Sequence, residues 1–122
     1  MLCGGDWLKT IEIIEKIWAK LVEKEAIDPI VLDMSRTNIP TDYFVIMTAN
    51  SNIHMKSLRE SILELLEEIG KEVIYWDKGD EYDWLLIDAA DIVIHIFTQD
   101  AREFYDLEGL WIDAERIRVL EK

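Results

Sequence analysis

The side chains most able to do chemistry in this chain are two histidines and a set of aspartates. The histidines, His54 and His95, pair neither with each other nor with the single cysteine, Cys3, at a spacing typical of metal ligands. His95 alternates with Val93 and Phe97 in an apolar run, which predicts a buried, hydrogen-bonded core histidine. His54 begins a predicted helix, where we expect a role at the surface.

Four aspartates stand at the ends of predicted strands, where an active site or a metal site can form: Asp33, Asp42, Asp88 and Asp91. Asp88 and Asp91 also flank a predicted turn, and aspartate is an ordinary turn residue. No two of these carboxylates are brought together by spacing alone. We therefore expect structural roles for them, and we do not expect an enzyme.

Other chemical signatures are weak. Ser51 has no neighbouring base in the sequence to activate it as a nucleophile. Gly4-Gly5 is the only paired glycine, and it precedes a predicted helix instead of following a strand, so it does not predict a phosphate-binding loop. We expect no catalytic residue, no metal and no cofactor.

The charge of the chain is more informative. It has 26 acidic and 13 basic side chains and a formal net charge of −13, which repels a nucleic-acid backbone. Residues 72–91 hold one base, Lys78, and seven acids: Glu72, Asp77, Asp80, Glu81, Asp83, Asp88 and Asp91. Such a segment fits a solvated loop, and it also fits a surface that attracts a basic partner.

The predicted fold is organised around the apolar residues of the segment 84–97. Two apolar runs, rich in Ile, Val and Leu, are joined by the short break at 88–91, which predicts an antiparallel hairpin. Trp84 stands at the entrance to this block, next to acids. Tryptophan is enriched in binding hot spots, so the residue pattern supports core packing and partner contact equally.

Three segments carry apolar residues at the three-and-four spacing of amphipathic helices: 6–26, 53–69 and 100–111. The capping residues that we expect are Asp6 for the first helix, and Ser51 or Asn52 with Gly70 for the second. The buried stripes that we expect are Trp7, Ile11, Ile14, Trp18 and Leu21, then Met55, Leu58, Ile62, Leu65, Leu66 and Ile69, then Ala101, Phe104, Leu107 and Trp111.

Five short apolar runs predict strands: 30–34, 43–48, 72–76, 84–87 and 92–97. Residues 43–48 are apolar on both faces, as in a central strand, and the strand–helix–strand order around 53–69 predicts a parallel crossover. The fold class that follows is α/β, with a mixed, mostly five-stranded sheet and about three flanking helices. We expect one domain over residues 1–122, with a core of about 6–113 and an unassigned tail at 114–122.

The sequence carries no apolar run near the ~18 residues of a membrane span and does not begin like a signal peptide. A cytoplasmic protein is therefore the expectation.

Four ordered motifs point to a known family. They are TDYFVI at 41–46, ANS at 49–51 followed by His54, DWLLID at 83–88 with DIVIHIF at 91–97, and REFYDLEGLW at 102–111. Together they cover most of residues 6–113, and on them the chain resembles the ribosomal silencing factor, or Iojap, family. The resemblance implies a nucleotidyltransferase-like shape without the catalytic carboxylate motif.

The resemblance also implies a function. Members of this family bind the large ribosomal subunit through ribosomal protein L-fourteen, block joining of the small subunit, lower translation when nutrients are short, and commonly form homodimers. Trp84 and Leu85 match the partner-contacting positions, with Asp83 and Asp88 as polar neighbours. One departure is Ala90, where the family usually has glycine; if this position needs a positive φ, alanine is strained there.

Two alternatives remain open at this level. One is a nucleotidyltransferase relative that binds nucleotides through the strand-end aspartates. The other is a plain dimerisation module that uses the face carrying Trp7 and Trp18.

Overall fold

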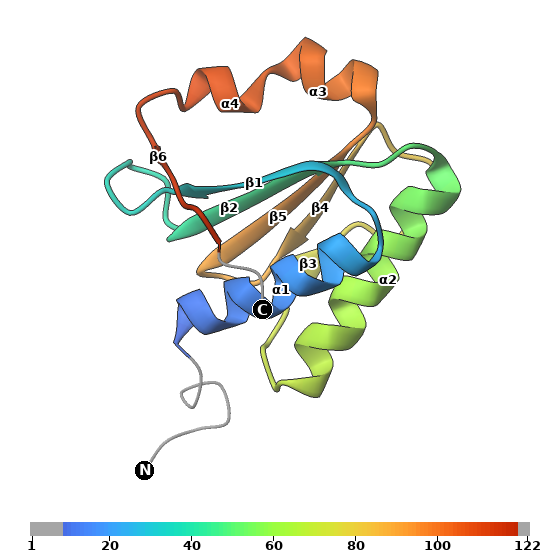
Figure 1. Cartoon of the computed structure of the whole chain (residues 1–122), viewed down its shortest axis with the longest axis horizontal. Coiled ribbons are helices and arrows are strands. Elements are labelled where there is room, and N and C mark those ends of the chain that lie inside the picture. Colours follow the sequence, from blue (N-terminus) through green and yellow to red (C-terminus); the bar gives the residue numbers. More distant parts are fainter. Residues whose placement is uncertain (1–8, 120–122) are drawn as a thin grey trace.

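The structure is a computed structural model that describes residues 9–119. Its centre is a mixed sheet of six strands: β1 (Ile27–Asp33), β2 (Tyr43–Thr48), β3 (Tyr75–Trp76), β4 (Trp84–Asp88), β5 (Ile92–Phe97) and β6 (Glu115–Arg116). Their spatial order is β3-β4-β5-β2-β1-β6 (Figure 1). Among the pairings within residues 9–119, only that of β2 with β5 is parallel.

The centre of the sheet follows the expected pattern. β2 occupies the predicted residues and is buried along five of its six positions, because both of its faces are covered. β4 and β5 form the predicted antiparallel hairpin, with Trp84 opposite Phe97 and Asp88 opposite Val93. The α/β class and the mixed sheet are therefore confirmed.

Helices cover both faces of the sheet. α1 (Thr10–Glu23) and α2 (Asn52–Glu68) lie on one face, and the short α3 (Gln99–Tyr105) and α4 (Leu107–Leu110) lie on the other (Figure 1). Two hydrophobic clusters follow from this layering. The larger joins α1 and α2 to the sheet, and the smaller joins the opposite face to Ala101 and Leu107.

The first helix is shorter than expected and presents a different face. It begins after Lys9, whose backbone N–H donates to the Glu12 carboxylate. Its buried residues are Ile13, Ile14, Ile17 and Leu21. Ile11 is exposed and Trp18 is half-buried, so the buried face is rotated from the predicted stripe. The reason is that the sequence has isoleucine at both 13 and 14, which is compatible with two different apolar stripes. Asp6 and Trp7 lie outside the described residues.

The second helix matches the prediction closely. The Ser51 hydroxyl caps it by accepting a hydrogen bond from the backbone N–H of His54, and Gly70 follows it at φ +76°. His54 is less exposed than expected. Its Nδ1 accepts from the Asn50 backbone N–H, and its Nε2 lies 2.8 Å from the carbonyl oxygen of Lys24, so it ties α2 to the end of α1.

The third helix is broken where we expected continuity. Asp106 adopts a left-handed conformation, with φ 46° and ψ 54°, which ends α3 and starts α4. The Asp106 carboxylate accepts a hydrogen bond from the Gly109 backbone N–H and caps α4. Ala101 is the buried residue of α3, and Phe104, predicted to be buried, is 82% exposed.

The edges of the sheet also differ from expectation. β3 is shorter than predicted, and it runs in the same direction as β2 with β4 and β5 between them. The segment that we left as a tail contributes β6, which pairs with β1 at Leu32 and Asp33, so the sheet has six strands instead of five. None of the helices within residues 9–119 has the length and apolar character needed to cross a membrane.

Candidate functional site

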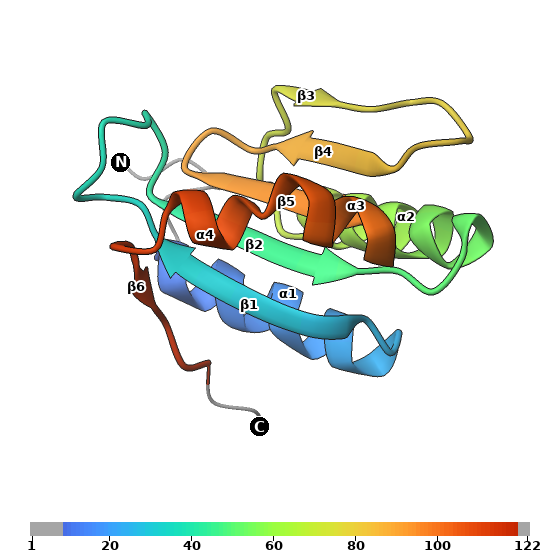
Figure 2. The ribbon, with the colours of Figure 1, turned by 90° about the horizontal axis from the view of Figure 1, so that it is seen from above.

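The outer face of β4 presents the most distinctive surface of the chain. Trp84, Leu86 and Asp88 alternate along one face of the strand, while Leu85 and Ile87 point to the α1–α2 side. Seen from above, α3 and α4 lie over the centre of the sheet, whereas β3 and β4 extend to one side with no helix over them (Figure 2). The Trp84 side chain is half-buried.

The Trp84 indole is held in place from two sides. Its Nε1–H donates a 3.0 Å hydrogen bond to Nδ1 of His95 on β5. Its ring centroid lies 4.9 Å from that of Phe97 and 4.9 Å from that of Tyr105 on α3. Tertiary contacts therefore fix the orientation of a large aromatic side chain that remains accessible, as expected of a preorganised contact residue.

His95 is the buried histidine that the alternation predicted. It is 4% exposed, and burial lowers its pKa to about 3, so it is neutral at physiological pH. Because Nδ1 accepts from Trp84, the ring proton must lie on Nε2, which has no hydrogen-bond partner among the described residues. The His95 ring packs edge to face with Phe44 at 4.5 Å. Sequence reasoning found its burial but not its role as the acceptor for Trp84.

Arg59 positions the acidic loop that leads into β4, and the sequence reasoning missed it. It is 4% exposed, and its Nη1 donates to the carbonyl oxygens of Asp77, at 3.0 Å, and Gly79, at 2.6 Å. Its guanidinium also lies 5.5 Å from the centre of the Trp76 ring. One signal was available: Arg59 falls three residues before Ile62, on the apolar stripe of α2, where an unpaired charge is costly.

The four residues marked by the resemblance occupy different environments. Asp83 is exposed beside Trp84. Leu85 is 1% exposed, on the opposite face of β4 in the larger hydrophobic cluster, so it offers no surface to a partner in this structure. Asp88 is half-buried at the far end of β4, about 13 Å from Trp84 at the usual rise of a strand, and its carboxylate accepts from the Ala90 backbone N–H. Asp83 and Trp84 are therefore the two of these four residues that lie side by side with accessible surface.

The strand-end aspartates gather at one end of the sheet, but most of them already have partners in the chain. The Asp33 carboxylate accepts from the backbone and hydroxyl of Ser35, which lowers its pKa. The Asp91 carboxylate lies 2.6 Å from Nζ of Lys71 and accepts from the Thr10 hydroxyl. Within residues 9–119, no three His, Cys, Asp or Glu side chains are grouped to hold a metal ion.

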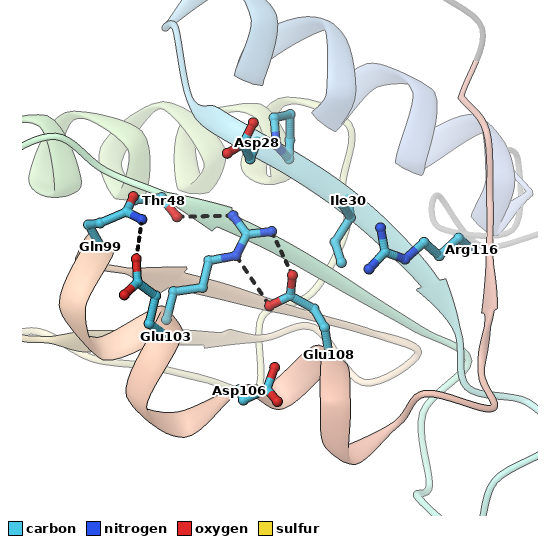
Figure 3. Close-up of a pocket in the computed structure, with 10 residues that line it drawn as sticks. Asp28, Ile30, Thr48, Gln99, Glu103, Asp106, Glu108 and Arg116 are labelled. Atoms are coloured by element: carbon cyan, nitrogen blue, oxygen red, sulfur yellow. Dashed lines mark hydrogen bonds and ion pairs between the residues drawn. The ribbon is translucent and has the colours of Figure 1, made fainter.

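A polar pocket of about 480 Å³ lies between the start of β1 and the helical segments α3 and α4. Figure 3 shows Thr48 on the sheet, with Glu103 and Glu108 on the helical segments opposite. The Arg102 side chain, which is 11% exposed, lies between Thr48 and Glu108. It binds the Glu108 carboxylate through Nε and Nη2, at 3.2 and 3.1 Å, and the Thr48 hydroxyl through Nη1, at 3.0 Å. This pocket therefore contains a structural clamp that fastens α3 and α4 to the sheet.

Comparison with known proteins agrees with this architecture. Residues 8–122 match the family model described as ribosomal silencing factor during starvation. Over 92 residues the chain is 37% identical to the ribosomal silencing factor RsfS of Bacillus subtilis, which covers 75% of this chain and 78% of the relative. It is also 32% identical over 97 residues to the chloroplastic protein Iojap of Zea mays, covering 80% of this chain and 42% of that longer protein.

The fold has solved counterparts as well. A crystal structure of a protein from Chromobacterium violaceum superposes with a TM-score of 0.81 at 26% identity, covering 94% of this chain and 95% of the other. The match of fold, the match of the family model over nearly the whole chain, and the identity to the Bacillus subtilis relative lead to one conclusion. This chain belongs to the ribosomal silencing factor family.

Proposed function

We propose that this protein is a non-enzymatic factor that binds the large ribosomal subunit through ribosomal protein L-fourteen and thereby blocks joining of the small subunit. The observation that carries the proposal is the placement of Trp84: a large aromatic side chain is held by His95 at an accessible position on β4. Such residues supply much of the binding energy of protein interfaces because they bury a large area at little entropic cost.

The charge of the segment before β4 supports a basic protein partner. Four exposed acids lie in the segment that leads into and past β3, namely Glu72, Asp80, Glu81 and Asp83. The one base of that segment, Lys78, has its Nζ 4.7 Å from the centre of the Trp76 ring. Ribosomal proteins are generally basic, so this surface steers the factor toward them and away from exposed phosphate backbone.

The mechanism that we propose is steric. A factor docked through Trp84 occupies the space that the small subunit needs, so translation falls without any chemical step, as suits a response to nutrient shortage. Leu85 supports this surface indirectly, because it packs β4 against α1 and α2. Asp88, at the other end of the same strand face, extends the acidic rim. We also propose that the protein acts in the cytoplasm and forms homodimers, as its family resemblance implies.

The test is co-sedimentation with isolated large subunits. We expect the wild-type protein to pellet with them and Trp84→Ala to lose at least ~2 kcal/mol of binding free energy, about 30-fold in Kd, as at a hot-spot residue. Trp111→Ala is the matched control, because Trp111 is a second half-buried tryptophan against the same hydrophobic cluster. Unchanged binding by Trp84→Ala rejects the role of Trp84.

Two further measurements test the mechanism itself. Purified L-fourteen should compete with the large subunit for the factor, and small subunits added afterwards should fail to join the occupied large subunits. If the wild-type protein does not bind large subunits at all, the proposed function is wrong.

A further inference from the structure

The exposed side of α3 carries two aromatic residues that the fold does not use as core. Phe104 is 82% exposed and Tyr105 is 50% exposed. Their rings meet edge to face at 5.1 Å, and the Tyr105 ring lies 4.9 Å from that of Trp84. The three side chains, Trp84, Tyr105 and Phe104, form one continuous strip from β4 onto α3, which we name the aromatic ledge.

The ledge is rigid because its supports are buried. Ala101 packs into the smaller hydrophobic cluster, and the Arg102 clamp binds Glu108 and Thr48, so α3 cannot roll without breaking these contacts. The left-handed Asp106 then ends the helix immediately after Tyr105. Phe104 is thereby held outward, with most of its apolar surface in water, a cost that a binding partner would remove.

The charges beside the ledge have one sign. Asp100, Glu103 and Asp106 are exposed on α3 and at its end, and Asp83 is exposed beside Trp84. The only base of α3, Arg102, is turned inward, 3.1 Å from Glu108. Aromatic faces next to carboxylates are the preferred environment of arginine and lysine side chains, which stack on the rings while their charges meet the acids.

We propose that the aromatic ledge is a single binding surface for a basic segment of the ribosomal protein partner, with arginine or lysine side chains stacking on Phe104 and Tyr105. This inference rests on the proposed function and extends its contact surface from one residue of β4 to the exposed side of α3. On this proposal the ledge binds a protein of the large subunit, and α3 takes part in recognising it. The sequence pattern had predicted α3 only as a helix packed against the core.

The experiment compares three variants in the same large-subunit binding assay. Phe104→Ala should weaken binding about tenfold or more, the usual effect of truncating an interface anchor, and Phe104→Arg should weaken it further by repelling a basic partner. Ile53→Ala is the matched control, because Ile53 is also 82% exposed but lies at the start of α2. Since Phe104 makes little contact with the fold, all three variants should unfold like the wild type.

The results separate the two proposals. If Trp84→Ala loses binding while Phe104→Ala and Phe104→Arg keep wild-type affinity, the ledge inference is overturned and the proposed function stands. If Phe104→Ala converts a dimer to a monomer in sedimentation equilibrium without changing subunit binding, the ledge serves self-association and the inference is again overturned. If the wild-type protein does not bind, the proposed function fails and the inference fails with it.

Discussion

The indole N–H of Trp84 donates to Nδ1 of His95, from one strand of the hairpin to the next, at 3.0 Å. This bond requires a neutral imidazole with its proton on Nε2, because a protonated ring has no acceptor. Burial provides that state by holding the pKa of His95 near 3. The orientation of the proposed contact residue thus depends on the protonation state of a core residue.

We predict from this bond that acid destabilises the protein through His95. In the unfolded chain a histidine gains its proton near pH 6.5, whereas folded His95 stays neutral down to about pH 3. The unfolded state therefore binds more protons between these values, and the free energy of unfolding falls as the pH falls, by at most about 1.4 kcal/mol per pH unit. Urea unfolding at several pH values between 7.5 and 4 measures this slope.

The variant His95→Gln isolates the contribution of this residue. Glutamine stays neutral and its side-chain oxygen can still accept from the Trp84 indole, so the variant should lose less stability on acidification than the wild type. An identical pH slope in the two proteins would show that His95 does not cause the acid loss.

Arg59 offers a second prediction, on the loop before β4. Its guanidinium binds two loop carbonyls while 4% exposed, so Arg59→Gln should reduce the free energy of unfolding by roughly 2 kcal/mol or more. Amide hydrogen exchange at residues 78–83 should also become faster. The control is Lys56→Gln, which removes an exposed 3.4 Å ion pair to Asp80 in the same loop and should cost about 0–1 kcal/mol. Equal effects of the two substitutions would reject the positioning of this loop by Arg59.

The Asp88–Asp91 turn gives a third prediction. Ala90 has φ +70°, in the left-handed region that favours glycine, so this alanine is strained. Ala90→Gly should raise the free energy of unfolding by roughly 1 kcal/mol, after allowance for the greater freedom of glycine in the unfolded chain. Ala19→Gly, in exposed helical backbone of α1, should lower it by a similar amount. A destabilising Ala90→Gly would show that the turn is not strained.

The Arg102 clamp gives a fourth prediction. Lysine cannot bind the Glu108 carboxylate and Thr48 together through a planar fork, so Arg102→Lys should cost roughly 2 kcal/mol of stability despite the retained charge. Thermal unfolding measures the cost. Lys20→Gln breaks a more exposed ion pair to Glu23 and should change stability by less than about 1 kcal/mol. If Arg102→Lys leaves the stability unchanged, α3 is fixed by its apolar contacts alone.

The sequence predicted the interior of the fold well because its signals there are local and strong. β2, the β4–β5 hairpin and α2 each combine a clear apolar period with turn or cap residues such as Ser51 and Gly70. The predictions were wrong where two patterns compete or where an element is very short. Ile11 and Ile13 allow two stripes for α1, and β6 is only two residues long, held by its pairing with β1.

The candidate site was less predictable, because it depends on contacts between distant segments. Trp84 could be singled out from its acidic surroundings, but its bond to His95 follows from the hairpin register and its contact with Tyr105 from the packing of α3 on the sheet. Leu85 illustrates the limit. The family resemblance placed it with Trp84 among the partner-contacting positions, whereas the two-residue period of a strand packs its side chain on the opposite face of β4.

The parallel pairing of β2 with β5 has a consequence for the kinetics of folding. Tyr43 pairs with Ile92 and Thr48 with Phe97, so the centre of the sheet can close only after α2, β3 and β4 have been looped out between them. Such non-local pairing slows folding. The β4–β5 hairpin is local in sequence, whereas α3 packs against a cluster that joins residues of β1, β2 and β5. Substitutions in β2 should therefore change the folding rate, and those at Arg102 mainly the unfolding rate.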